Sequence, residues 1–94
     1  MEQRPIAQGT GTGNNVLGVY SDRLELRSGI PGQNTTSVSL KQVANVSIRG
    51  WVNCTLTIEI NDGRRLNLER MALPDARQIK AVIERQKRMA GLHE

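Results

Sequence analysis

The sequence predicts an α+β fold: a small antiparallel, curled sheet or partly open barrel of six to seven strands, with one C-terminal amphipathic helix. Short runs of alternating apolar and polar residues recur as far as Glu69, and short turns join them. A helical period appears only after that point. Because no crossover helix separates the strands, a parallel sheet is excluded. Curling reduces the exposed edges, which a single helix cannot cover.

Length and composition limit what this fold can contain. The chain has 94 residues, which predicts one domain, and its aromatic residues are one Trp, one Tyr and no Phe. The core is therefore expected to consist of Val, Leu and Ile. We expect a flexible lead-in at residues 1–13, a domain at 14–90 and a tail at 91–94. No apolar run is long enough for a membrane span and no signal-peptide core is visible, so a cytoplasmic location is expected.

The first third of the chain predicts two strands and a loop. The Gly- and Thr-rich lead-in matches neither a dinucleotide fingerprint nor a phosphate-binding loop, and it either stays mobile or orders late as a strand. Residues 15–20 (NVLGVY) form a short apolar run typical of a buried strand. Residues 23–28 alternate with Leu24 and Leu26 on one face. Pro31 and two glycines predict a loop over residues 29–34.

The middle of the chain carries the strongest strand signals. Residues 36–41 and 43–49 alternate on either side of a tight corner. From Val52 to Ile60, five apolar residues share one parity, which predicts a half-buried antiparallel strand. Asp62-Gly63 predicts a type I′ hairpin turn, and residues 65–69 return with Leu66 and Leu68 facing inward.

A helix is predicted from about residue 75 to residue 90. Pro74 and Asp75 suit a helix N-terminus, and Gly91 suits the position just after the C-terminus. At 100° per residue, one arc of the helix collects the residues expected to be buried: Ala76, Ile79, Val82, Ile83, Gln86, Met89 and Ala90.

Taken together, these segments resemble the bacterial pleckstrin-homology-like domains. The likeness rests on DRLELRSGI, TTSVSLKQVANVSIR, TLTIEINDGRRLNLER and LPDARQIKAVIE, and it spans about Gly18 to Gln86. It departs from the family at Val38-Ser39, where the family tends to have an apolar residue followed by proline. The resemblance implies a barrel of seven strands or slightly fewer capped by the C-terminal helix. It implies no shared catalytic residues, and some members act as appended interaction modules or form ring-like oligomers.

Residues for catalysis or for metal or cofactor binding are scarce. The one histidine, His93, lies in the tail, and Cys54 shares the parity of Leu56 and Ile58, which predicts a packed thiol. One His and one Cys are too few for a zinc site. We therefore expect neither an enzyme nor a cofactor.

Trp51 is the most informative single residue. Strict alternation places it on the polar face with Arg49 and Asn53, where it would anchor a protein partner or a second copy of the chain. A bulge at Gly50 would instead shift the phase and bury Trp51, and the scarcity of aromatic residues in the core favours this alternative. Tyr20 is expected in the core or at its rim.

The net charge of +4 arises entirely in the last third of the chain, because residues 1–63 hold five cations and five anions. A basic segment predicts either an ordinary solvated helix face or an anionic partner, namely nucleic acid or an acidic membrane surface. The residues expected to bind such an anion, if the helix leans on the last hairpin, are Arg64, Arg65, Arg70, Arg77, Lys80, Lys87 and Arg88.

Overall fold

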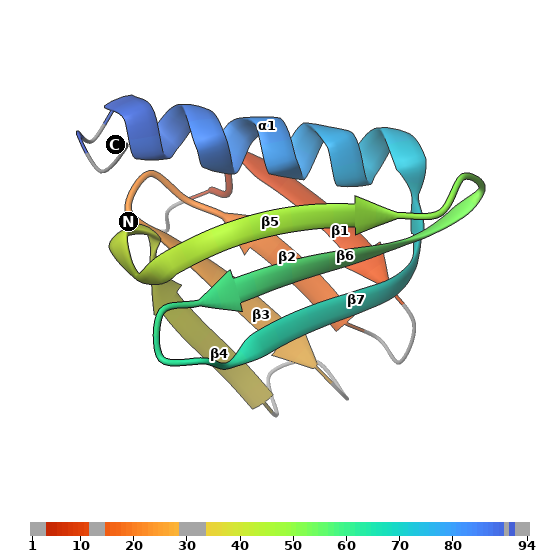
Figure 1. Ribbon diagram of the computed structural model, residues 1–94, viewed down its shortest axis with the longest axis horizontal. Helices are drawn as coiled ribbons and strands as arrows, with labels where there is room; N and C mark the ends of the chain where they lie inside the picture. Colours follow the sequence, from red (N-terminus) through yellow and green to blue (C-terminus); the bar gives the residue numbers. More distant parts are fainter. Residues whose placement is uncertain (1–3, 12–14, 29–33, 90, 92–94) are drawn as a thin grey trace.

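The structure is a computed structural model that describes residues 4–11, 15–28, 34–89 and 91. Within these residues, seven strands come first and one long helix comes last, which confirms the predicted α+β class (Figure 1). The elements are β1 (Ala7–Gly11), β2 (Asn15–Val19), β3 (Arg23–Ser28), β4 (Asn34–Ser39), η1 (Leu40–Gln42), β5 (Val43–Arg49), β6 (Asn53–Ile60), β7 (Arg65–Ala72) and α1 (Leu73–Met89).

The strands form two antiparallel sheets. One contains four strands in the order β1-β2-β3-β4, and the other contains three in the order β5-β6-β7. Within each sheet, consecutive strands pair with each other, and the 3-10 turn η1 carries the chain from β4 in one sheet to β5 in the other. Among the described residues no strand pairing joins the two sheets, so they are not closed into a barrel. The antiparallel strands and the C-terminal helix are as predicted, but the strands form two separate sheets and not one curled sheet or partly open barrel.

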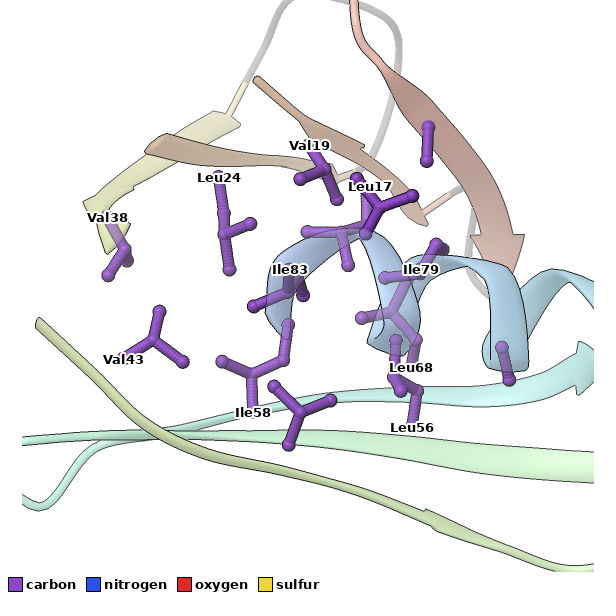
Figure 2. Close-up of a cluster of buried hydrophobic side chains, with 14 of the residues drawn as sticks. Leu17, Val19, Leu24, Val38, Val43, Leu56, Ile58, Leu68, Ile79 and Ile83 are labelled. Atoms are coloured by element: carbon purple, nitrogen blue, oxygen red, sulfur yellow. The ribbon is translucent and has the colours of Figure 1, made fainter. Parts of the chain in front are cut away.

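The core lies between the two sheets and beneath α1 (Figure 2). Leu17, Val19 and Leu24 of the first sheet face Leu56 and Ile58 of the second, and all five are fully buried. As the composition predicts, the buried set is mainly Val, Leu and Ile. Tyr20 is buried at the margin of this core, and the Arg23 guanidinium lies 4.3 Å from the centre of its ring.

β1 shows that the expected lead-in contains a strand. Ala7–Gly11 pairs antiparallel with β2 along its whole length, as in the alternative in which this stretch orders as a strand. The flexible reading is therefore wrong for these residues. Residues 1–3 and 12–13 of the lead-in, the loop at 29–33, and residues 92–94 of the tail lie outside the described residues.

The strand β6 confirms the strongest alternation in the sequence, but only from Cys54 onward. Cys54, Leu56, Ile58 and Ile60 are buried, and the residues between them are half-buried. The turn that follows is not of type I′, because only Gly63 has a positive φ, of 96°. The Gly63 N–H donates to the Ile60 carbonyl at 2.9 Å, which fits a type I turn followed by a glycine bulge.

The helix α1 begins two residues earlier than predicted and ends within one residue of the prediction. Ala76, Ile79, Val82, Ile83 and Gln86 are buried, as the helical period predicts. Met89, the last residue of α1, was expected on the same face, but it is 74% exposed. Gly91 has φ of 72° and caps the helix as predicted, and Ala90 lies outside the described residues.

Candidate interaction site

The hairpin between β5 and β6 presents two large apolar side chains to solvent. Trp51 is 88% exposed and Val52 is 81% exposed, and both lie in the short connection between the strands. This hairpin extends beyond the N-terminal end of α1 (Figure 1). Two adjacent apolar residues with this exposure form a surface that a partner can bury.

Gly50 fixes the direction of this turn. Its φ is 100°, and a Cβ at this position would lie 2.8 Å from the carbonyl oxygen of Asn53. The Gly50 carbonyl accepts a hydrogen bond from the Cys54 thiol, with 3.5 Å between sulfur and oxygen. The turn therefore packs closely against the first residues of β6, and Trp51 and Val52 project away from it.

The structure corrects two predictions here. Burial of Trp51, favoured by the lack of core aromatics, is wrong, and so is the inward position of Val52. Gly50–Val52 forms the connection between β5 and β6, so the alternation of β6 does not extend back to Val52. Trp51 lies in this connection and not on a bulged strand that faces the core. The predicted row Arg49, Trp51 and Asn53 is exposed at all three positions.

The strand β5 pairs with β6 on one side only. No other strand among the described residues pairs with its second side, which faces α1. The two elements run in opposite directions along each other (Figure 1). Two separate hollows lie where these elements meet.

The hollow beside the exposed tryptophan has a volume of about 320 Å³ and is lined by Ile48, Gly50, Trp51, Leu73 and Arg77. The hollow at the other end has a volume of about 290 Å³. Its lining is Val43, Ala44, Asn45, Val46, Ile83, Glu84, Lys87 and Arg88. Both hollows therefore combine apolar side chains with cations at the rim.

The predicted anion-binding residues separate into two groups. Arg77, Lys87 and Arg88 lie on α1 beside β5, and Lys80, on the same helix, forms an ion pair with Glu84 at 3.5 Å. The Lys87 ammonium donates to the Val43 carbonyl at 2.6 Å, so it also holds the helix to the edge of β5. Arg77 thus lines one hollow, and Lys87 and Arg88 line the other.

The other three predicted cations lie elsewhere. Arg64 and Arg65 are at the β6–β7 turn, where the Arg64 guanidinium donates to the Asp62 carboxylate at 2.6 Å. Asp62 also accepts the Arg64 backbone N–H, and this bond is the main cause that lowers the pKa of Asp62. Arg70 lies on β7, with a positive φ of 55° where the pairing register with β6 shifts. The seven residues do not form one patch.

A second charged cluster, on β3, was not predicted. Arg23 donates to the Glu25 carboxylate at 2.8 Å and to the Asp22 carboxylate at 2.9 Å while it covers the ring of Tyr20. The bond to Glu25 is the main cause that raises the pKa of Arg23. The spacing of two residues, which places both side chains on one face of a strand, could have indicated it. Because its charges compensate one another, this cluster is a structural network.

The described part of the chain shows no cluster of metal ligands. It contains no group of three or more His, Cys, Asp or Glu residues that could hold a metal ion. Cys54 is fully buried and packed in the core, as predicted. None of the described helices is long and apolar enough to cross a membrane. Neither the models of known protein families nor the curated proteins with which the chain was compared match its sequence.

Proposed function

We propose that this chain is a small non-enzymatic interaction module that binds a protein partner, or a second copy of itself, through the β5 edge and Trp51. The observation that carries the proposal is an almost fully exposed tryptophan beside the edge of β5 that pairs with none of the described strands. Tryptophan and arginine dominate the binding energy of protein interfaces, and Arg49 and Arg77 flank Trp51 here. The free edge of a strand offers a row of backbone donors and acceptors to a partner.

The energetic case rests on the area that a partner would remove from water. A tryptophan side chain buries roughly 150–250 Å² on full burial, and apolar area contributes about 25 cal/mol per Å². Burying Trp51 would therefore contribute about 4–6 kcal/mol before the entropy lost on association is subtracted. This is enough to make one residue the anchor of an interface.

A second proposed function is anion binding by the basic last third of the chain, on nucleic acid or on acidic lipid headgroups. The cations of α1 beside β5 favour it. The separation of Arg64, Arg65 and Arg70 from them reduces the number of phosphates that one ligand could contact at once. Titration with duplex DNA, single-stranded DNA and acidic vesicles at low and high salt tests it, because each duplex phosphate contact steepens the salt dependence of log K by about 0.9.

We also propose that the chain is a pleckstrin-homology-like domain. The support is the resemblance over Gly18–Gln86 together with the order of the elements, with strands first and one closing helix last. The separate sheets depart from the closed form that the resemblance implies. Because one fold serves many functions, the interaction role rests on the site and not on this likeness.

The protein-binding proposal is tested by comparing the wild-type chain with Trp51→Ala. The matched control is Met89→Ala, which removes another exposed apolar side chain at the far end of α1. We expect the wild type and Met89→Ala to bind the same co-purifying protein, or to self-associate in size-exclusion chromatography with light scattering, and Trp51→Ala to lose this binding. Wild-type binding by Trp51→Ala, or a monomer that captures nothing, would contradict the proposal.

A further inference from the structure

We infer that two copies of this chain associate through their β5–β6 hairpins, with Trp51 of each copy in the hollow beside Trp51 of the other. This association rests on the proposed function, and of the partners allowed there it selects a second copy and defines the contact. Three features of the described residues support it: a projecting apolar pair, a hollow next to this pair, and the guanidinium group that borders the hollow.

The projecting pair consists of Trp51 and Val52. These two are 88% and 81% exposed, whereas the other exposed large apolar residues of the described chain, Ile6 and Met89, occur singly in the sequence. The turn that carries the pair is held by Gly50, which has no room for a Cβ. A projection that is already ordered loses little conformational entropy when a partner covers it, and this favours association.

The hollow beside the pair has a volume of about 320 Å³, which is at the lower end of the range for pockets that hold small ligands. Trp51 borders it from the hairpin, and Leu73 and Arg77 border it from α1. Ile48 and Leu73 also pack against the core, so they give the hollow an apolar floor. A space of this size and chemistry fits one planar aromatic group better than a chain segment.

A projection and a hollow that lie side by side meet the main requirement of a two-fold interface. Both copies use the same surface in such an interface, so each must supply the projection and its receptor. With the axis beside Trp51, the indole of each copy enters the hollow of the other, between Trp51 and Arg77 of that copy. The two indoles then stack at the axis, and the outer face of each meets Arg77 of the other copy.

This arrangement limits the repulsion between like charges across the axis. Arg77 forms no ion pair within the described residues, so its guanidinium can lie on the face of an indole in a cation–π contact. The two Arg77 guanidinium groups are then separated by both indoles, a distance of roughly 10 Å or more, which is about one Debye length at 0.1 M salt. Their mutual repulsion is therefore largely screened.

The area that this contact would remove from water is sufficient for a weak dimer. Two tryptophan side chains bury roughly 300–500 Å² on full burial. With the surfaces that cover their outer faces and with Val52 of both copies, the total approaches about 1,000 Å², the lower limit for a specific interface. We therefore expect a dimer that dissociates in the micromolar range.

The test combines sedimentation velocity with circular dichroism in the indole bands, both measured over a range of protein concentrations. We expect the wild type to shift from monomer to dimer as the concentration rises, and the stacked indoles to give an exciton couplet that grows with the dimer fraction. Trp51 is the sole tryptophan, so a couplet between two indoles requires two copies. The dimer is expected to persist at high salt, because apolar burial holds it, whereas phosphate binding would weaken.

Variants then locate the contact. Trp51→Ala is expected to remain monomeric, and Met89→Ala, which also removes an exposed apolar side chain, is expected to dimerise like the wild type. Arg77→Gln is expected to raise the dissociation constant of the dimer about five- to thirtyfold, because each dimer loses two cation–π contacts. Arg65→Gln, at the β6–β7 turn, removes the same charge elsewhere and is expected to change little.

The possible results separate the two proposals. A chain that stays monomeric at high concentration but binds a co-purifying protein through Trp51 would overturn the dimer and leave the proposed function standing. A Trp51-dependent dimer without a couplet, or one that dissociates at high salt, would overturn the stacked contact and also leave the proposed function standing. A dimer that persists in Trp51→Ala would overturn both.

Discussion

Gly50 determines where Trp51 points, and it does so through two separate constraints. Its φ of 100° is unfavourable for any other residue, and the Asn53 carbonyl leaves no room for a Cβ. Gly63 has nearly the same φ, of 96°, but nothing lies within 4 Å of its Cβ position. Substitutions at the two glycines therefore distinguish the effect of backbone strain, which both share, from that of steric overlap, which only Gly50 has.

Gly50→Ala is expected to lower the free energy of unfolding by about 2–4 kcal/mol, and Gly63→Ala by only about 1–2 kcal/mol, because only the first adds overlap to strain. Urea unfolding of both variants measures the difference. Equal losses would mean that the turn around Gly50 is looser than described.

The lowered pKa of Asp62 predicts the direction in which the stability of the fold changes with pH. The Arg64 backbone N–H lowers the pKa of Asp62 in the folded chain, so ionised Asp62 adds stability above its unfolded pKa of about 3.9. This contribution is lost as the pH falls through the lower, folded pKa. Asp62→Asn keeps an acceptor and removes the charge, so the wild type is expected to exceed this variant in stability at neutral pH and to converge with it in acid. Unfolding by urea across this range is the measurement, and a constant difference contradicts the sign.

At the scale of elements, α1 joins the two sheets. Ile83 is fully buried and lies between residues of both sheets (Figure 2). Ile83→Ala is expected to reduce the free energy of unfolding by about 2–5 kcal/mol, the usual range for such a cavity. Because small domains have total stabilities of about 5–15 kcal/mol, this would unfold a measurable part of the population.

Arg85→Ala, at an exposed position of the same helix, is the control and is expected to melt like the wild type. If Ile83→Ala also melted like the wild type by circular dichroism, α1 would not dock on the sheets.

β1 and the tip of β6 show why some elements could not be predicted. The inward positions of β1 are occupied by Ala7, Gly9 and Gly11. These residues are small because α1 and β7 pack closely against β1, and a Cβ on Gly9 would lie 2.7 Å from Ile79. Small residues at these positions remove the apolar alternation by which a strand is predicted. At Val52 a buried strand position is predicted where none exists. Val52 is apolar and has the same parity as the buried residues of β6, but it lies before the strand and is exposed.

At the scale of the whole molecule, the sequence predicts the class, most elements and the exposed row of Arg49, Trp51 and Asn53, but not which cations lie beside that row. Alternation and helical period are local, so they locate the strands from Asn15 to Glu69 and the buried face of α1. Closure of the sheets depends on contacts between distant strands, and no local pattern encodes them. The hollow beside Trp51 could not be predicted for the same reason, because only the packing of α1 along β5 places Arg77 beside Trp51 and leaves Arg64 elsewhere.

The exposure of Trp51 in the free monomer is the central claim of this account, and its fluorescence tests it most directly. As the sole tryptophan, Trp51 is expected to emit at the wavelength of indole in water and to be quenched fully by iodide, since its side chain is 88% exposed. Emission shifted to the blue and protected from iodide, in a chain shown by light scattering to be monomeric, would contradict the claim and place Trp51 in the core.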